Sequence, residues 1–284
     1  PRAIAIDPFI PDYGTDLATE VAPYAFYVNG TGSNASAQTV HKVPLAKFTQ
    51  LSGSPRRFSL FATAGTSIMD ATDPDNLAMV TGGPGAIDRF SRYIQTANLF
   101  QKLYFVDGKG VPIYYDPITS SIKKLKATIG KVPLGAKLVE GWRGRLVLGL
   151  GQNWFMSRRD EPTDWDFLPF QPEETQAVAG NNSPAGLFPD SLNTLIPYSD
   201  DVLIFGGDKS IYQMSGDPAA GGRFDLLTDK TGISFGRPWT KDPNGIIYFF
   251  GSRGGLYRMV PGRTPERISV NRIERRLQDV NLST

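Results

Sequence analysis

The chain has 284 residues, a length that suits one large all-β domain or two smaller ones. Its 30 Gly and 22 Pro exclude a helical bundle, and 40% hydrophobic residues exclude a disordered chain. Lys and Arg (30) nearly balance Asp and Glu (28), which excludes a strong overall attraction to nucleic acid or anionic lipid, and the absence of Cys excludes disulfides, thiolate metal sites and cysteine nucleophiles.

The N-terminal residues 1–24 are rich in Pro and acidic groups, and we expect them to form an irregular arm that reaches a neighbouring subunit. They lack the basic segment and apolar core of a targeting signal, and the apolar stretches of the chain are too short to span a bilayer. Residues 25–284 are expected to form one propeller-like domain. A chain without Cys suits synthesis in a reducing cytoplasm.

A repeated unit follows in chain order. Each copy runs through an apolar strand, a Gly turn, a second apolar strand and a polar loop that holds Pro, which is the pattern of a β-hairpin. The five copies begin near residues 58, 103, 146, 202 and 246 and read FSLFATAGTSIMDATDP, LYFVDGKGVPIYYDP, LVLGLGQNWFMSRRDEP, VLIFGGDKSIYQMSGDP and IIYFFGSRGGLYRMVP.

Two independent markers share one period of about 43 residues. The turn glycines are 43, 43, 56 and 44 residues apart and the loop prolines 43, 45, 56 and 43; they are Gly65, Gly108, Gly151, Gly207, Gly251 and Pro74, Pro117, Pro162, Pro218, Pro261. A third apolar or alternating segment follows most copies, at Asn76, Ser121, Trp165, Phe224 and Glu266. Three or four strands in such a period predict the blades of a β-propeller.

Three other segments complete the prediction. The long third step indicates an insertion at residues 172–189, which are polar and loop-like. Residues 25–51 could supply part of a sixth blade. In residues 271–280, NRIERRLQDV, apolar side chains recur at i, i+4 and i+7, which predicts one short C-terminal helix.

Catalytic signatures are missing. His41 is the only histidine and lies in an apparent strand, and no Gly-x-Ser-x-Gly elbow exists. The acidic residues that a glycosidase would need form three turn-associated groups, and Asp favours turns because it can bond nearby amides. These groups are Asp70, Asp73 and Asp75; Asp160, Glu161, Asp164 and Asp166; and Asp200 and Asp201.

Metal and phosphate sites are not predicted either. DATDPDN, residues 70–76, lacks the central Gly and closing Glu of an EF-hand loop. The Gly runs at Gly82, Gly206 and Gly251 lack the Lys-Ser/Thr ending of a phosphate loop. Paired arginines could meet phosphates only if they converge on one face, and they are Arg56, Arg57, Arg143, Arg145, Arg158, Arg159, Arg253, Arg258, Arg272, Arg275 and Arg276. No cofactor or metal is therefore expected.

Three segments resemble β-propeller virion proteins of tailed phages, nearest the tail nozzle (tail tubular protein B) of short-tailed phages. They are SRRDEPTDWDF (157–167), PYSDDVLIFGGDKSIYQMSGDP (197–218) and GISFGRPWTKDPNGIIYFFGSRGGLYRM (232–259). The resemblance implies a ring of six subunits beneath the adaptor that follows the portal, around the channel through which DNA leaves without sequence-specific binding. The chain is shorter than a full nozzle protein, and no catalytic role carries over.

The resulting hypothesis is a non-catalytic structural protein of the phage tail, which contacts copies of itself, adaptor or portal proteins and tail fibres. The alternative is a glycan- or receptor-binding propeller in which Trp154, Trp165 and Trp239 stack on sugar rings. An enzyme is the third possibility.

Overall fold

The computed structural model describes residues 37–44, 58–64, 66–71, 78–88, 91 and 94–270. Within these residues the chain is all-β, with five four-stranded sheets and one two-stranded pair. The one helical turn described is a 3₁₀ helix, η1 (Pro218–Ala220), and no described helix could cross a bilayer. The expected arm at 1–24 and the expected helix at 271–280 lie outside the described residues.

Each four-stranded sheet is an antiparallel meander, and we name the sheets blades 1 to 5 in chain order. Blade 1 holds β1 (Ala37–Pro44), β2 (Phe58–Ala64), β3 (Ser67–Asp70) and β4 (Ala78–Met79), and blade 2 holds β5 (Gln95–Leu99), β6 (Lys102–Val106), β7 (Ile113–Asp116) and β8 (Ser121–Lys124). Blade 3 holds β10 (Leu138–Trp142), β11 (Arg145–Leu150), β12 (Asn153–Met156) and β14 (Val178–Ala179). Blade 4 holds β15 (Leu192–Ser199), β16 (Val202–Gly207), β17 (Ile211–Ser215) and β18 (Arg223–Thr228), and blade 5 holds β19 (Trp239–Lys241), β20 (Ile247–Phe250), β21 (Leu256–Met259) and β22 (Glu266–Arg267).

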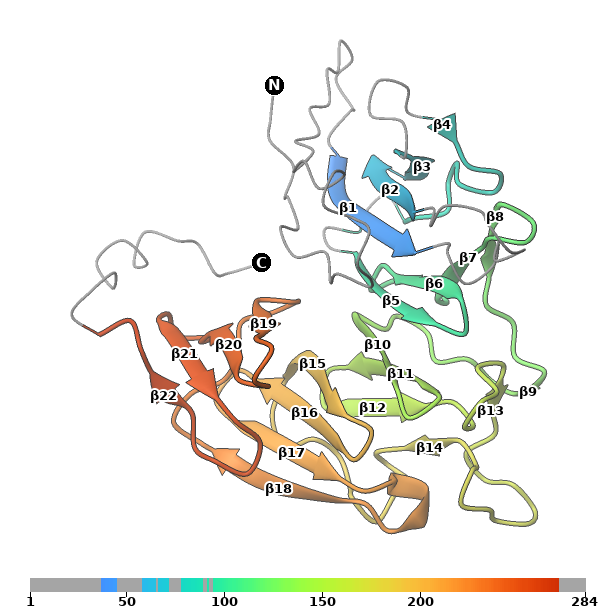
Figure 1. Ribbon diagram of the computed structural model, residues 1–284. Coiled ribbons are helices and arrows are strands. Elements are labelled where there is room, and N and C mark those ends of the chain that lie inside the picture. Colours follow the sequence, from blue (N-terminus) through green and yellow to red (C-terminus); the bar gives the residue numbers. More distant parts are fainter. Residues whose placement is uncertain are drawn as a thin grey trace.

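The blades follow one another along an arc (Figure 1). The first strands, β1, β5, β10, β15 and β19, lie on its inner side, and the fourth strands lie on its outer side. Strand β10 contacts both β5 and β15, so the inner strands of adjacent blades touch. This is the arrangement of a β-propeller, and it confirms the predicted fold class.

The predicted hairpins each join the second and third strands of a blade. Gly108 and Gly151 have positive φ values of 75° and 61°, as a tight turn requires, and Gly65 lies outside the described residues. Gly207 and Gly251 lack positive φ, so the turn argument is wrong for them. They are crowded instead: a Cβ on Gly207 would lie 2.5 Å from Asp190 Oδ2, and one on Gly251 would lie 2.6 Å from Tyr257 Cε2.

Two strand predictions need correction. The segment at Trp165 does not join blade 3; Asp164–Trp165 (β13) pairs in parallel with β9 (Ile129–Gly130), and Trp165 is buried between blades 2 and 3. The fourth strand of blade 3 is β14, which lies inside the expected insertion at 172–189. Similarly, β1 is the first strand of blade 1, so residues 37–44 do not belong to a sixth blade.

A separate apolar core fills each of the four interfaces between consecutive blades. Because side chains alternate along a strand, Leu103 and Phe105 face blade 1 while Tyr104 and Val106 face blade 3. Eight apolar side chains on the second strands of blades 2 to 5 are all at most 1% exposed: Leu103, Phe105, Leu146, Leu148, Leu203, Phe205, Ile247 and Phe249.

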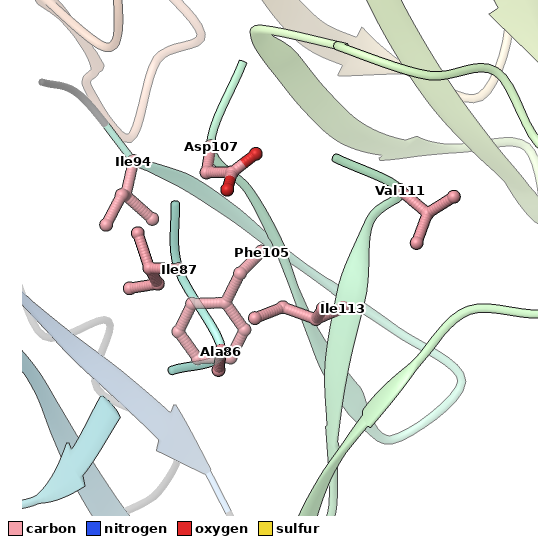
Figure 2. A pocket seen from close by; sticks show the side chains of 7 residues that line it. All are labelled: Ala86, Ile87, Ile94, Phe105, Asp107, Val111 and Ile113. Atoms are coloured by element: carbon pink, nitrogen blue, oxygen red, sulfur yellow. The ribbon is translucent and has the colours of Figure 1, made fainter. Parts of the chain in front are cut away.

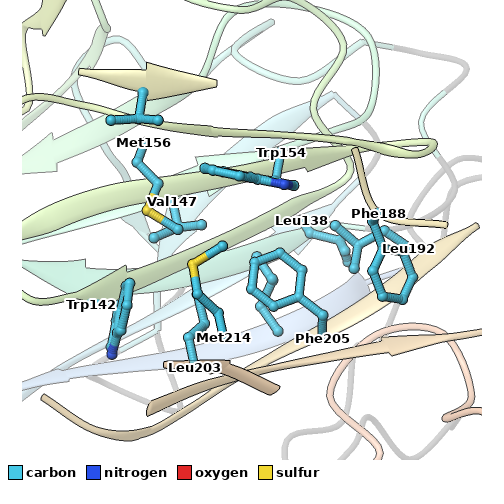
Figure 3. Packing of buried hydrophobic residues seen from close by; sticks show 12 residues of the cluster. Leu138, Trp142, Val147, Trp154, Met156, Phe188, Leu192, Leu203, Phe205 and Met214 are labelled. Atoms are coloured by element: carbon cyan, nitrogen blue, oxygen red, sulfur yellow. The ribbon is translucent and has the colours of Figure 1, made fainter. Parts of the chain in front are cut away.

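The largest of these cores joins blades 3 and 4 (Figure 3). The ring of Trp154 meets that of Phe205 edge-on, with centroids 6.2 Å apart, and Met214 and Leu203 pack beside them. The Trp142 indole donates a hydrogen bond of 2.7 Å to the carbonyl of Ser199 at the rim. Aromatic packing of this kind holds the two blades as one unit.

Candidate functional site

Two of the acidic residues in turns accept hydrogen bonds from nearby backbone amides. Asp164 Oδ1 accepts from the amide of Asp166 at 3.0 Å, and Asp166 Oδ1 accepts from Leu168 at 3.0 Å. Asp190, which sequence reasoning did not single out, accepts from the amides of Lys209 and Ser210. Among the described residues, no group of three His, Cys, Asp or Glu could hold a metal ion.

A buried arginine–aspartate cluster connects blades 3 and 4. Arg145 on β11 is fully buried, and its Nη atoms donate to the carbonyl oxygens of Ser157 (2.9 Å), Gln176 (2.6 Å) and Glu174 (3.1 Å). Arg145 Nη2 also donates to both carboxylate oxygens of Asp217, at 3.1 and 3.2 Å. One guanidinium therefore ties the long β12–β14 connection of blade 3 to the β17–β18 loop of blade 4.

Asp217 is the centre of this cluster. Its side chain is 3% exposed, accepts from Arg159 and the Ala219 amide, and lies 3.7 Å from Arg143 Nε. Burial raises the pKa of Asp217, but the Ala219 amide and the guanidinium groups of Arg145 and Arg159 outweigh burial and hold the pKa below its usual range. Asp217 is therefore an ionised anchor at neutral pH.

The four arginines of the sequence pairs Arg143/Arg145 and Arg158/Arg159 thus have different acidic partners. Arg143, Arg145 and Arg159 converge on Asp217, and Arg143 also bonds Asp201 across the seam at 3.1 Å. Arg158 turns to Asp164 and Glu173. All four arginines are therefore paired with carboxylates, three of them across the seam between blades 3 and 4, which argues against a phosphate site there.

A second ion pair lies near the inner strands. Glu140 on β10 is buried and accepts from Arg237, which precedes β19. Burial raises the pKa of Glu140 above its usual value, and Arg237 opposes the shift. The Arg237 guanidinium also lies 5.9 Å from the ring centre of Trp239. This pair joins blade 3 to blade 5.

The proposed sugar-stacking tryptophans are not arranged for that role. Trp154 and Trp165 are 0% and 1% exposed, so neither can offer a ring face to a ligand. Only Trp239 is partly exposed, and Arg237 covers part of it. The prediction failed for two of the three because aromatic residues in β-strands are used equally well in blade packing.

An exposed apolar loop is the feature most suited to contact with another molecule. The chain between β13 and β14 projects beyond the strands of blade 3 (Figure 1). On this loop Leu168 is 79% exposed and Phe170 is 99% exposed. The surrounding residues 160–174 contain six acidic residues and no basic one. Exposed large apolar side chains grouped in this way are typical of interaction sites.

One small recess lies between blades 1 and 2 (Figure 2). It is lined by Ala86, Ile87, Ile94, Phe105, Asp107, Val111 and Ile113 and has room for about one water molecule. The Asp107 carboxylate beside it already accepts from the amides of Asp88, Lys109 and Gly110. The recess is a packing defect beside a capped turn.

The fold is similar to that of solved structures, among them the two that follow. With YCF48 bound to a D1 peptide, the chain has a TM-score of 0.53 and 10% identity, over 84% of this chain and 69% of that one. With the extracellular domain of the hybrid two-component system BT3049 from B. thetaiotaomicron, the TM-score is 0.53 and the identity 10%, over 82% of this chain and 30% of that one. No family model and no curated protein matches the sequence. The protein is therefore of the β-propeller class, and these similarities concern the fold alone.

Proposed function

We propose that this protein is a structural subunit of a bacteriophage tail, of the nozzle type, which forms an oligomeric ring around the DNA exit channel. The observation that carries the proposal is a rigid set of blades that presents an exposed apolar loop. The cluster around Asp217 fixes both ends of the β12–β14 connection, so Leu168 and Phe170 project from a firm base. Such a surface suits permanent assembly better than turnover of a substrate.

The proposed location in the tail rests on the three phage-like segments. Two of them, 157–167 and 197–218, contain Arg159, Asp201 and Asp217 of the cluster between blades 3 and 4. In the proposal the subunit is made in the host cytoplasm and resides in the virion, where its partners are copies of itself, the adaptor or portal and the tail fibres. DNA passes through the ring without sequence-specific binding or chemistry.

The test is a phage that lacks this protein. Particles should package DNA yet leak it or fail to deliver it, and the purified protein should restore them. Normal delivery by particles that lack the protein would refute the proposal.

A receptor-binding propeller is the second candidate, favoured by the similarity to YCF48, which was solved with a bound peptide. It predicts that the isolated monomer binds surface polysaccharide or peptide. Cleavage of polysaccharide that is lost in Asp164→Asn or Asp201→Asn would instead indicate an enzyme. In the structure Asp164 is buried and Asp201 is paired with Arg143.

A further inference from the structure

We propose that the acidic loop of one copy docks onto the basic edge of blade 5 in the next copy, and that this contact builds the ring. The acidic loop is residues 160–174, and the basic edge is residues 253–267 with the flanking Val270. The inference rests on the proposed function, because it names the surface through which copies of the chain would join.

The acidic loop combines exposed apolar side chains with unpaired carboxylates. Phe170 and Leu168 are its most exposed large apolar side chains, at 99% and 79%. Asp160, Glu161 and Glu174 are exposed and form no ion pair with another described residue. An apolar tip with unpaired carboxylates around it favours a partner with an apolar patch inside a basic rim.

Blade 5 offers that complement. Residues 253–267 contain four arginines and a single acidic residue, Glu266. Arg253 and Arg263 are exposed and make no ion pair within the described part of the chain, whereas Arg258 is bonded to Glu266 at 2.8 Å. Val260 and Val270 are 39% and 46% exposed beside them. Apolar contact and opposite charge thus coincide on both surfaces.

The positions of the two surfaces explain why the contact would propagate. The loop between β13 and β14 and the edge strand β22 lie at opposite sides of the arc (Figure 1). Two different complementary patches give a heterologous contact. After two copies join, the pair still has one free acidic loop and one free basic edge. Such contacts close into a ring when the rotation permits, which a two-fold contact through one patch cannot do.

Disulfide cross-linking tests this contact directly, because the chain contains no Cys. The variants F170C and V260C are purified separately, mixed under mild oxidation and compared with I118C mixed with V260C. Ile118 is 82% exposed but belongs to the β7–β8 turn of blade 2 and to neither of the two surfaces, so it is a matched control. F170C with V260C should give a covalent dimer, and the variant carrying both should give a ladder of higher species; I118C should give neither.

Light scattering of the Cys-free chain separates the possible failures. If L168D/F170D raises the apparent dissociation constant of the oligomer roughly 30-fold or more and I118D leaves it unchanged, the contact is supported. If the chain oligomerises equally with and without L168D/F170D and the cross-link is missing, this contact is wrong while a ring through another surface stands. If the wild-type chain stays monomeric at high concentration, the contact and the proposed ring are both refuted.

Discussion

Replacing Asp217 by Ala should destabilise the protein by about 3 kcal/mol. Removal of one partner of a buried ion pair costs about 3–5 kcal/mol because the remaining charge stays buried. Arg145 is fully buried but keeps three carbonyl acceptors, so we expect the lower end of that range. Arg159 and Arg143 are partly exposed and regain water, and they add little.

Urea denaturation followed by circular dichroism measures this loss as a lower midpoint at unchanged slope. Asp225→Ala is the matched control, since Asp225 pairs with Arg223 on the surface, where side chains are 43% and 76% exposed. That control should change stability by less than about 0.5 kcal/mol. Hydrogen exchange should also rise in residues 216–222 of the Asp217 variant. A loss below about 1 kcal/mol would refute the view that Asp217 holds blades 3 and 4 together.

The pKa of Asp217 is lowered in the fold, so the stability it contributes is complete above the unfolded pKa of about 3.9 and is lost as pH falls towards the folded pKa. Acid titration of unfolding should show this loss in wild type and not in Asp217→Asn. Phe205→Ala should cost about 3–5 kcal/mol in urea unfolding, whereas Phe170→Ala should cost less than about 0.5 kcal/mol, and equal costs would contradict the assigned burial. Gly130→Ala should lower thermal stability, because φ is 73° and the new Cβ would lie 2.3 Å from the backbone of Trp165; an unchanged melting temperature would exclude the β9–β13 pairing.

Much of the fold could be predicted because each hairpin contains its own signal. The alternation in segments such as Leu103–Phe105 assigns one set of side chains to each neighbouring blade, and the cores follow from it. The spacing of Gly and Pro predicted the repeated unit. At Gly207, however, glycine is required because a Cβ would clash with neighbouring atoms, and not because the φ angle is positive.

The errors concern contacts that are distant in sequence. Trp165 is of a residue type that is common in strands, but its strand pairs with β9, 35 residues earlier in the chain. The local sequence pattern does not show which strand it pairs with. The two-residue strand β14 is too short to show any period.

The buried cluster was missed for the same reason. An arginine that begins the apolar strand Arg145–Leu150 signals a buried partner, and Asp217 before Pro218 signals a helix cap. Neither signal tells which acid, 72 residues away, meets which arginine.

In the proposed function this chain occupies a fixed structural place in a phage tail. Quantitative mass spectrometry of purified particles, calibrated on the portal protein, tests it most directly. We expect a constant stoichiometry of six copies for each tail, as the resemblance to nozzle proteins implies. Absence of this protein from the particles, or a copy number that varies between preparations, would contradict the proposed function.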